Sequence, residues 1–97
     1  MDEPNDRMKF SEEALRLIQM IAEQLVDQPD KVSCTYSLGE NTTVITIKSD
    51  KKDVGKLIGK QGRMANSLRE ILKSISAKNK VRMVLEIGDD HPLIGHD

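Results

Sequence analysis

The chain has 97 residues, of which 37% are hydrophobic and 32% charged, and its formal net charge is −1. This length suits one domain with one hydrophobic core, and the composition is typical of a soluble globular protein. No apolar run approaches the length of a membrane span, and the polar, acidic residues 1–9 do not look like a signal peptide. A single cysteine, Cys34, excludes an internal disulfide and a cysteine-based metal cluster. We therefore expect a cytoplasmic protein that does not associate with membranes.

Charge is distributed unevenly along the chain. Residues 1–30 carry a net charge of −5 and residues 31–50 a net charge of zero. Residues 51–84 contain ten basic and two acidic side chains, a net charge of +8, whereas residues 85–97 carry −4. A concentrated basic segment favours an anionic partner, but the same lysines also fit an ordinary solvated helix face. Charge alone does not decide between these interpretations.

The first predicted element is a helix that follows a flexible tail of residues 1–10. Ser11 has the chemistry of a helix N-cap, and apolar residues recur at helical spacing from Ala14 to Leu25. Pro29 ends the pattern, because the residue before a proline avoids the helical region. We expect this helix to pack on the core.

Two strands are predicted next. Residues 32–38 alternate apolar and polar side chains, as a half-buried strand does, and Cys34 then becomes a buried small hydrophobe rather than a nucleophile. Residues 39–41, Gly-Glu-Asn, supply a turn, and residues 42–48 are rich in β-branched side chains. The short connection predicts a hairpin.

The basic half of the chain predicts two helices and a strand. Residues 51–58 form a short helix capped by Ser49 or Asp50, residues 63–77 form a longer one, and residues 81–87 alternate as a third strand. Three apolar side chains of the short helix are expected to face inward: Val54, Leu57 and Ile58.

The resulting order, α-β-β-α-α-β, predicts an α+β domain over residues 11–87. A strand, a helical crossover and a second strand give parallel neighbours, to which the hairpin adds an antiparallel strand. We expect a three-stranded mixed sheet with helices packed on one face. The acidic residues 88–97 are expected to form a C-terminal tail, in which His91 and His96 are solvated rather than metal ligands.

The segment Gly59-Lys60-Gln61-Gly62 lies between the two later helices, inside the basic block. The N–H groups that begin the second helix have no intrahelical partners and, with the helix dipole, favour a bound phosphate. Glycines allow unusual backbone angles and remove side chains that would block a sugar–phosphate backbone. Lys60, Arg63 and Lys56 add positive charges. A plain glycine turn is the alternative, and the basic, interhelical setting favours phosphate binding.

An apolar surface beside this loop is expected to receive bases. Val54, Ile58 and strand residues such as Ile45 are its predicted floor, and Gly55 leaves room for close approach by a neighbour or ligand. Gln61 stands where a P-loop needs a metal-binding Ser or Thr, and no nucleophile–base set is present. We predict no enzyme activity, no cofactor and no metal.

The run Val54-Gly55-Lys56-Leu57-Ile58-Gly59-Lys60-Gln61-Gly62-Arg63 resembles the KH domain signature, and the element order is similar to its type II form. Most of the chain, about residues 13–87, looks like the small bacterial KH-domain RNA-binding family KhpA, also called YlqC-like. The resemblance implies that the loop clamps about four nucleotides of single-stranded nucleic acid. By position, Gly59, Lys60, Gln61 and Gly62 would hold phosphates, Gly55 and Ile58 would line the groove, and Arg63 would flank it.

The family resemblance also implies a cellular role. It suggests an RNA chaperone or post-transcriptional regulator that acts with a larger KhpB- or Jag-like partner and is linked to cell-envelope homeostasis and cell-length control. Self-association as a homodimer is compatible with so small a domain. One alternative stays open, a module that binds proteins through a KH fold and has little RNA binding of its own.

Overall fold

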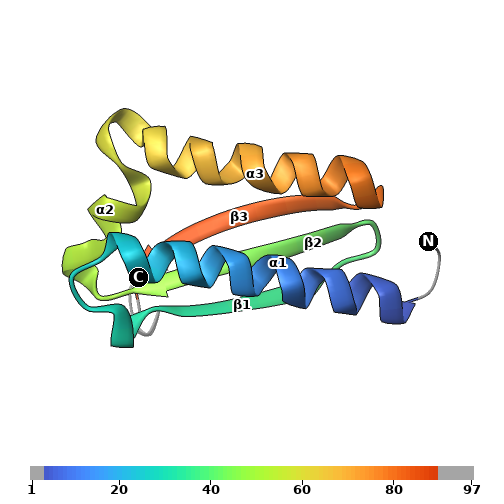
Figure 1. Cartoon of the computed structure of the whole chain (residues 1–97), viewed down its shortest axis with the longest axis horizontal. Coiled ribbons are helices and arrows are strands. Elements are labelled where there is room, and N and C mark those ends of the chain that lie inside the picture. The colour runs from blue at the N-terminus through green and yellow to red at the C-terminus, as the bar shows by residue number, and fades with distance from the viewer. Residues whose placement is uncertain (1–3, 90–97) are drawn as a thin grey trace, which may run out of the picture.

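In the computed structural model, which describes residues 4–89, three strands form one sheet in the order β1-β2-β3. Strand β1 (Ser33–Leu38) is antiparallel to β2 (Thr42–Ser49), and β3 (Arg82–Asp89) is parallel to β2. Helices α1 (Pro4–Leu25), α2 (Val54–Ile58) and α3 (Arg63–Asn79) form a second layer over the sheet (Figure 1). The described residues also include 3-10 turns: η1 (Pro29–Lys31), η2 (Lys51–Asp53) and η3 (Lys60–Gly62). The predicted α+β fold and its mixed sheet are confirmed.

The core lies between the sheet and the helices. Ile45 and Ile47 of β2 are fully buried and belong to one cluster with Ile18 of α1, Leu68 of α3 and Leu85 of β3. Side chains alternate along a strand, so one face of β2 is committed to this cluster. Burial of these side chains fixes how α1 and α3 sit on the sheet.

The predicted hairpin turn and helix cap are present. The N–H of Gly39 donates to the carbonyl oxygen of Thr42 at 2.7 Å, which closes the turn between β1 and β2. The Asp50 side chain accepts a hydrogen bond from the N–H of Lys52 at 3.0 Å and caps η2. The helix predicted over residues 51–58 is therefore real but divided into η2 and α2.

The N-terminal boundary was predicted wrongly. Helix α1 begins at Pro4, and Ser11 is a fully buried residue inside it whose Oγ lies 3.2 Å from Oγ1 of Thr43. The added turns are anchored on the hairpin, because the Arg7 guanidinium donates to the carbonyl oxygen of Gly39 at 2.8 Å. The flexible tail is thus contradicted from Pro4 onward, by tertiary contacts that local sequence does not reveal.

The C-terminal boundary also differs. Strand β3 continues through Gly88 to Asp89, so these two residues, predicted to begin the tail, belong to the sheet. The rest of that tail, with His91 and His96, lies outside the described residues. Within residues 4–89, no helix combines the length and hydropathy needed to cross a membrane.

Candidate nucleic-acid interface

The predicted glycine loop forms a single turn between α2 and α3. Its backbone lies largely in left-handed conformations: φ is 79° at Gly59, 57° at Gln61 and 76° at Gly62. The N–H of Gly59 donates to the carbonyl oxygen of Gly55 at 2.8 Å, and the N–H of Gly62 donates to that of Gly59 at 3.0 Å. These bonds hold the turn in one defined shape.

The two glycines of the loop have different tasks. A Cβ at Gly59 would lie 2.7 Å from both the Cβ and the N of Met64, so only glycine fits there. A Cβ at Gly62 would meet no atom of the described residues within 4 Å. Gly59 is therefore required by the fold itself, whereas Gly62 leaves open space in front of α3.

The start of α3 is suited to an anion. Its N-cap residue, Gly62, has no side chain that can accept hydrogen bonds from the first helical turn. The N–H of Arg63 donates a hydrogen bond to the carbonyl oxygen of Lys60. In general the first turn of a helix favours a phosphate oxygen, because its N–H groups have no intrahelical partners and the positive end of the helix dipole lies there.

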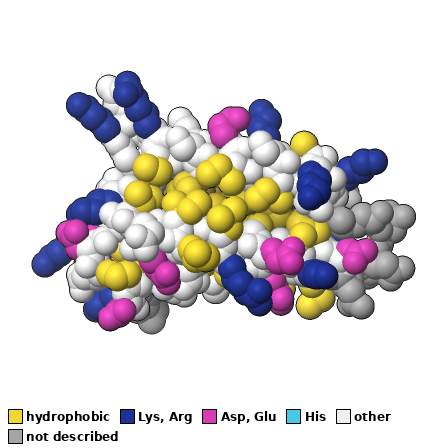
Figure 2. Space-filling view, viewed as in Figure 1, with side chains coloured by type: hydrophobic (Ala, Val, Ile, Leu, Met, Phe, Trp, Pro, Cys, Tyr) yellow, Lys and Arg dark blue, Asp and Glu magenta, His cyan; other side chains and the backbone are white. Residues whose placement is uncertain are grey.

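Cationic side chains stand beside this helix start. Lys60, Gln61 and Arg63 are all exposed, and Arg63 Nη2 donates to Gln61 Oε1 at 3.3 Å. Figure 2 shows Lys and Arg side chains projecting from the end of the molecule where this loop lies in Figure 1. The structure thus brings together the predicted phosphate-contacting residues at positions 59–63.

Lys56 does not join this group. Its Nζ lies 3.2 Å from Oδ2 of Asp27 and 3.5 Å from Oδ1 of Asp53. The hydrogen bond and charge of Asp27, followed by those of Asp53, raise the pKa of Lys56 against the smaller opposing effect of burial. We assign Lys56 to the attachment of α2 to the end of α1 and remove it from the predicted phosphate contacts.

Asp53 is the buried partner in this attachment. It is 1% exposed, and its two oxygens accept hydrogen bonds from the N–H groups of Asp27 at 3.2 Å and Gln28 at 3.0 Å. Burial opposes its charge, but these backbone bonds and Lys56 together lower the pKa of the Asp53 carboxyl. Because α2 leads directly into the loop, this carboxylate also fixes where the loop begins.

The predicted apolar floor is only partly correct. Ile58 is 39% exposed beside the loop, which contradicts its inward-facing prediction but suits a surface for bases. Val54 is half-buried, and Gly55 is exposed, with no atom of the described residues within 4 Å of the place that a Cβ would take. Ile45 is fully buried in the core, so its assignment to the groove is wrong.

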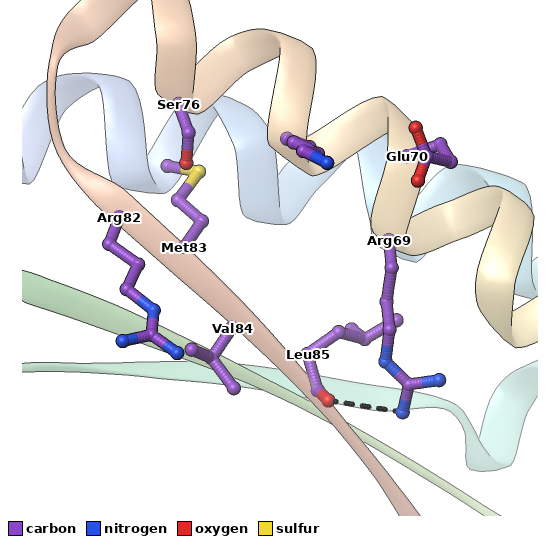
Figure 3. Close-up of a pocket in the computed structure, with 8 residues that line it drawn as sticks. Arg69, Glu70, Ser76, Arg82, Met83, Val84 and Leu85 are labelled. Carbon is purple, nitrogen blue, oxygen red and sulfur yellow. Dashed lines mark hydrogen bonds between the residues drawn. The ribbon is translucent and has the colours of Figure 1, made fainter.

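A groove that the sequence did not predict lies between α3 and β3, with a volume of about 390 Å³ (Figure 3). Arg69, Lys73 and Ser76 line it from α3, and Arg82 and Met83 from β3. The sequence feature that could have indicated this groove is the spacing of Arg69 and Lys73, since residues four apart share a helix face. The contribution of β3 requires the tertiary structure.

Taken together, the α-β-β-α-α-β order and the G-x-x-G turn between two helices define a KH domain. The family model for the KhpA/KhpB KH domain matches residues 16–87, and the chain belongs to this family. No group of three or more His, Cys, Asp or Glu side chains suited to a metal ion occurs in the part of the chain that the structure describes.

Relatives match over most of their length. The chain is 48% identical over 71 residues to RNA-binding protein KhpA of Aquifex aeolicus, which covers 73% of this chain and 90% of that protein. It is 38% identical over 82 residues to RNA-binding protein KhpA of Borreliella burgdorferi, covering 84% of this chain and all of that protein (100%).

A solved structure shares the fold. Era, in a crystal structure with MgGDPNP and nucleotides 1506-1542 of 16S ribosomal RNA, is similar with a TM-score of 0.52. The match covers 78% of this chain and 29% of that one at 18% identity, and it therefore supports the fold alone.

Proposed function

We propose that the protein is a non-catalytic single-stranded RNA-binding protein whose loop at residues 59–62 clamps the RNA backbone. The observation that supports this proposal most directly is the exposed turn that bears Lys60 and Arg63 at the start of α3. The N-cap residue of that helix, Gly62, has no capping side chain. The relatives named RNA-binding protein KhpA support RNA as the ligand. The family's nucleic-acid-binding fold supports a binding rather than a catalytic role.

In this proposal each part of the interface has a distinct task. The first N–H groups of α3 and the side chains of Lys60 and Arg63 hold phosphates. Ile58 and Val54 offer apolar surface to a base, and Gly55 lets the strand approach α2 closely. Since the contacts are mainly with the backbone, affinity falls as salt rises.

The test replaces the two central loop residues by aspartate in K60D/Q61D. Binding of a fluorescent single-stranded RNA is followed by anisotropy, and we expect a loss of affinity of at least about tenfold, because the anion site becomes acidic. The melting temperature should change little, since both side chains are exposed and aspartate tolerates the left-handed backbone of Gln61.

A matched control carries the same change of charge on α1, in K9D/Q24D, where both side chains are also exposed. This variant should keep most RNA affinity. If K60D/Q61D binds RNA as tightly as the control does, the loop is not the RNA site.

We further propose a cellular role as a cytoplasmic RNA chaperone or post-transcriptional regulator that acts with a larger KhpB- or Jag-like protein. Effects on cell-envelope homeostasis and cell length would follow from the regulated RNAs. Crosslinking and sequencing of bound RNA from cells, comparing the natural chain with K60D/Q61D, tests this role. Equal RNA recovery from the two strains would contradict it.

The alternative is a protein-interaction module, and one observation favours it. Helix α1 exposes Leu17 by 41% and Met20 by 64%, and these residues, three positions apart, share one face of the helix. Figure 2 shows hydrophobic side chains gathered in a band across the helical layer. If this face mediates self-association, L17K/M20K should be monomeric in sedimentation while the natural chain forms dimers. If the monomeric variant keeps its RNA affinity, RNA binding and self-association are separate functions.

A further inference from the structure

Strand β1 is an outer strand of the sheet, and its outer edge pairs with no other described strand. The N–H of Gly39 donates to the carbonyl oxygen of Thr42, which sets the phase of the antiparallel ladder between β1 and β2. Because residues alternate along such a ladder, Thr35 turns its backbone groups toward β2. Those of Cys34 and Tyr36 point outward, and no hydrogen bond from another described segment reaches them.

The residues of β1 do little to protect this edge. Natural edge strands usually carry charged side chains, prolines or bulges that discourage pairing with another chain. None of the six residues Ser33–Leu38 is charged or a proline, although 32% of the whole chain is charged. The opposite edge differs, since β3 carries Arg82 and Glu86, and the Arg69 guanidinium donates to one of its carbonyl oxygens at 3.4 Å. Strand β1 is therefore the edge that an extended peptide can join through main-chain hydrogen bonds.

Helix α1 packs more closely on β1 than on the rest of the sheet and forms a wall along this strand (Figure 1). The Tyr36 hydroxyl donates to Glu12 Oε2 at 3.3 Å. Burial, followed by the charge of Glu23, raises the pKa of the Cys34 thiol to about 11. Both carboxylates thus lie on the side of α1 that borders β1, separated by about 16 Å of helix.

The charge of this wall favours a basic partner over a second copy of the chain. A strand added to β1 directs every second side chain toward α1, where Lys or Arg would face Glu12 and Glu23. Arg16, one turn from Glu12, reduces the negative charge without cancelling it. If two copies paired β1 with β1, the acidic sides of both α1 helices would meet at one seam, where like charges repel.

From these observations we propose that the outer edge of β1 is a docking site for an extended segment of a partner protein. The segment joins the sheet as an additional strand and places basic side chains beside Glu12 and Glu23. This inference goes beyond the proposed RNA-binding function and does not depend on it, since no residue of β1 belongs to the proposed RNA interface.

The first measurement is amide hydrogen exchange of the natural chain alone, at high dilution. At a free edge the outward N–H of Tyr36 should exchange at least about tenfold faster than the N–H of Thr35, which faces β2. Equally slow exchange at the two positions would show that a second copy or another part of this chain already covers the edge. That result would overturn the inference.

The second measurement uses three synthetic peptides of about eight residues with blocked ends, in which Thr alternates with Lys, Gln or Glu. Main-chain hydrogen bonds are common to all three, so the peptides differ in the charge that faces α1. We expect the Lys peptide to shift the amide signals of Cys34, Tyr36 and Leu38 in NMR spectra and to bind at least about fivefold more tightly than the Gln peptide. The Glu peptide should bind most weakly. Equal affinities, no binding, or binding that leaves these amides unchanged would contradict the proposal.

A pair of variants tests the acidic wall. E12Q/E23Q should lower the affinity for the Lys peptide to about that for the Gln peptide. The matched control, E13Q/E70Q, removes two exposed carboxylates away from this wall and should bind as the natural chain does. Circular dichroism should give both variants the melting temperature of the natural chain. If the two variants bind the Lys peptide equally well, the wall does not select a basic partner and the proposal fails.

Discussion

Lys56 Nζ lies 3.5 Å from Oδ1 of Asp53, a carboxylate that is only 1% exposed. The lysine belongs to the glycine-rich signature, and the sequence predicts that it contacts a phosphate. In the folded chain it helps a buried carboxylate to hold α2 against the end of α1. Lys56 is therefore not counted among the charges that the proposed RNA-binding function uses, and the position of the loop depends on Asp53.

Replacing Asp53 by asparagine should destabilise the domain. An amide keeps only one acceptor oxygen, so one of the N–H groups of Asp27 and Gln28 loses its partner, and Lys56 loses a counter-charge. We expect a lower melting temperature for D53N at neutral pH, measured by circular dichroism. D30N is the control, because Asp30 is exposed, and it should melt with the natural chain.

The difference in melting temperature between the natural chain and D53N should depend on pH. The pKa of Asp53 is lower in the folded state than its ordinary value of 3.8, so the ionised carboxylate stabilises the fold. This contribution is fully present above that ordinary value and is lost as pH falls through the lower, folded-state pKa. The difference in melting temperature between the natural chain and D53N should be constant from pH 7 to about 5 and shrink below about 4. A difference that grows in acid would contradict this assignment.

Substitution by alanine should lower the free energy of unfolding by different amounts at the two loop glycines, Gly59 and Gly62. G59A places a Cβ against Met64 at a backbone angle reserved for glycine, and we expect a loss of at least about 2 kcal/mol of unfolding free energy. G62A meets no described neighbour and should cost only about 1 kcal/mol for its left-handed conformation. Urea denaturation measures both, and equal losses would show that the Met64 contact is unimportant.

At Gly55, in contrast, substitution by alanine should raise the stability of the protein. It lies inside α2, where a Cβ meets no described atom within 4 Å, so alanine should stabilise the protein by up to about 1 kcal/mol. If the RNA strand approaches α2 at this point, G55A should also weaken RNA binding. Greater stability with weaker binding would indicate that the glycine serves the ligand. Unchanged affinity would remove Gly55 from the interface.

Ser11 and Thr43 should be energetically coupled. Both side chains are fully buried and their hydroxyl oxygens lie 3.2 Å apart. S11A leaves the Thr43 hydroxyl without this partner and should cost about 1–3 kcal/mol. S11A/T43V removes both hydroxyls, so its loss in urea denaturation should be smaller than the sum of the two single losses. Strict additivity would show that the hydroxyl pair contributes nothing.

Cys34 should react slowly while the protein is folded. Burial, assisted by the charge of Glu23, raises the pKa of this thiol to about 11, and the thiolate is the reactive form. Alkylation by iodoacetamide at pH 8 should be much slower than in urea and should accelerate as pH approaches 11. Equally fast reaction of the folded and unfolded chains would contradict the buried, unreactive thiol that the strand pattern predicts.

Local sequence patterns were sufficient for the elements and for the place of the loop. The alternation around Cys34 and the turn at Gly39 specified the hairpin, because strand periodicity and turn chemistry are local properties. The glycines at 59 and 62, between two helical patterns, marked the loop for the same reason. A strand–helix–strand crossover then required β2 and β3 to be parallel, as observed.

Only the tertiary structure decided which side chains face the ligand. Ile45 and Ile58 have the same chemistry, yet one is fully buried and the other 39% exposed, because burial depends on which elements cover a residue. Lys56 pairs with Asp27, which lies in another part of the chain, and the first turns of α1 are anchored by a hairpin far away in sequence. The groove between α3 and β3 likewise exists only where these two elements lie side by side, since long-range packing brings its lining side chains together.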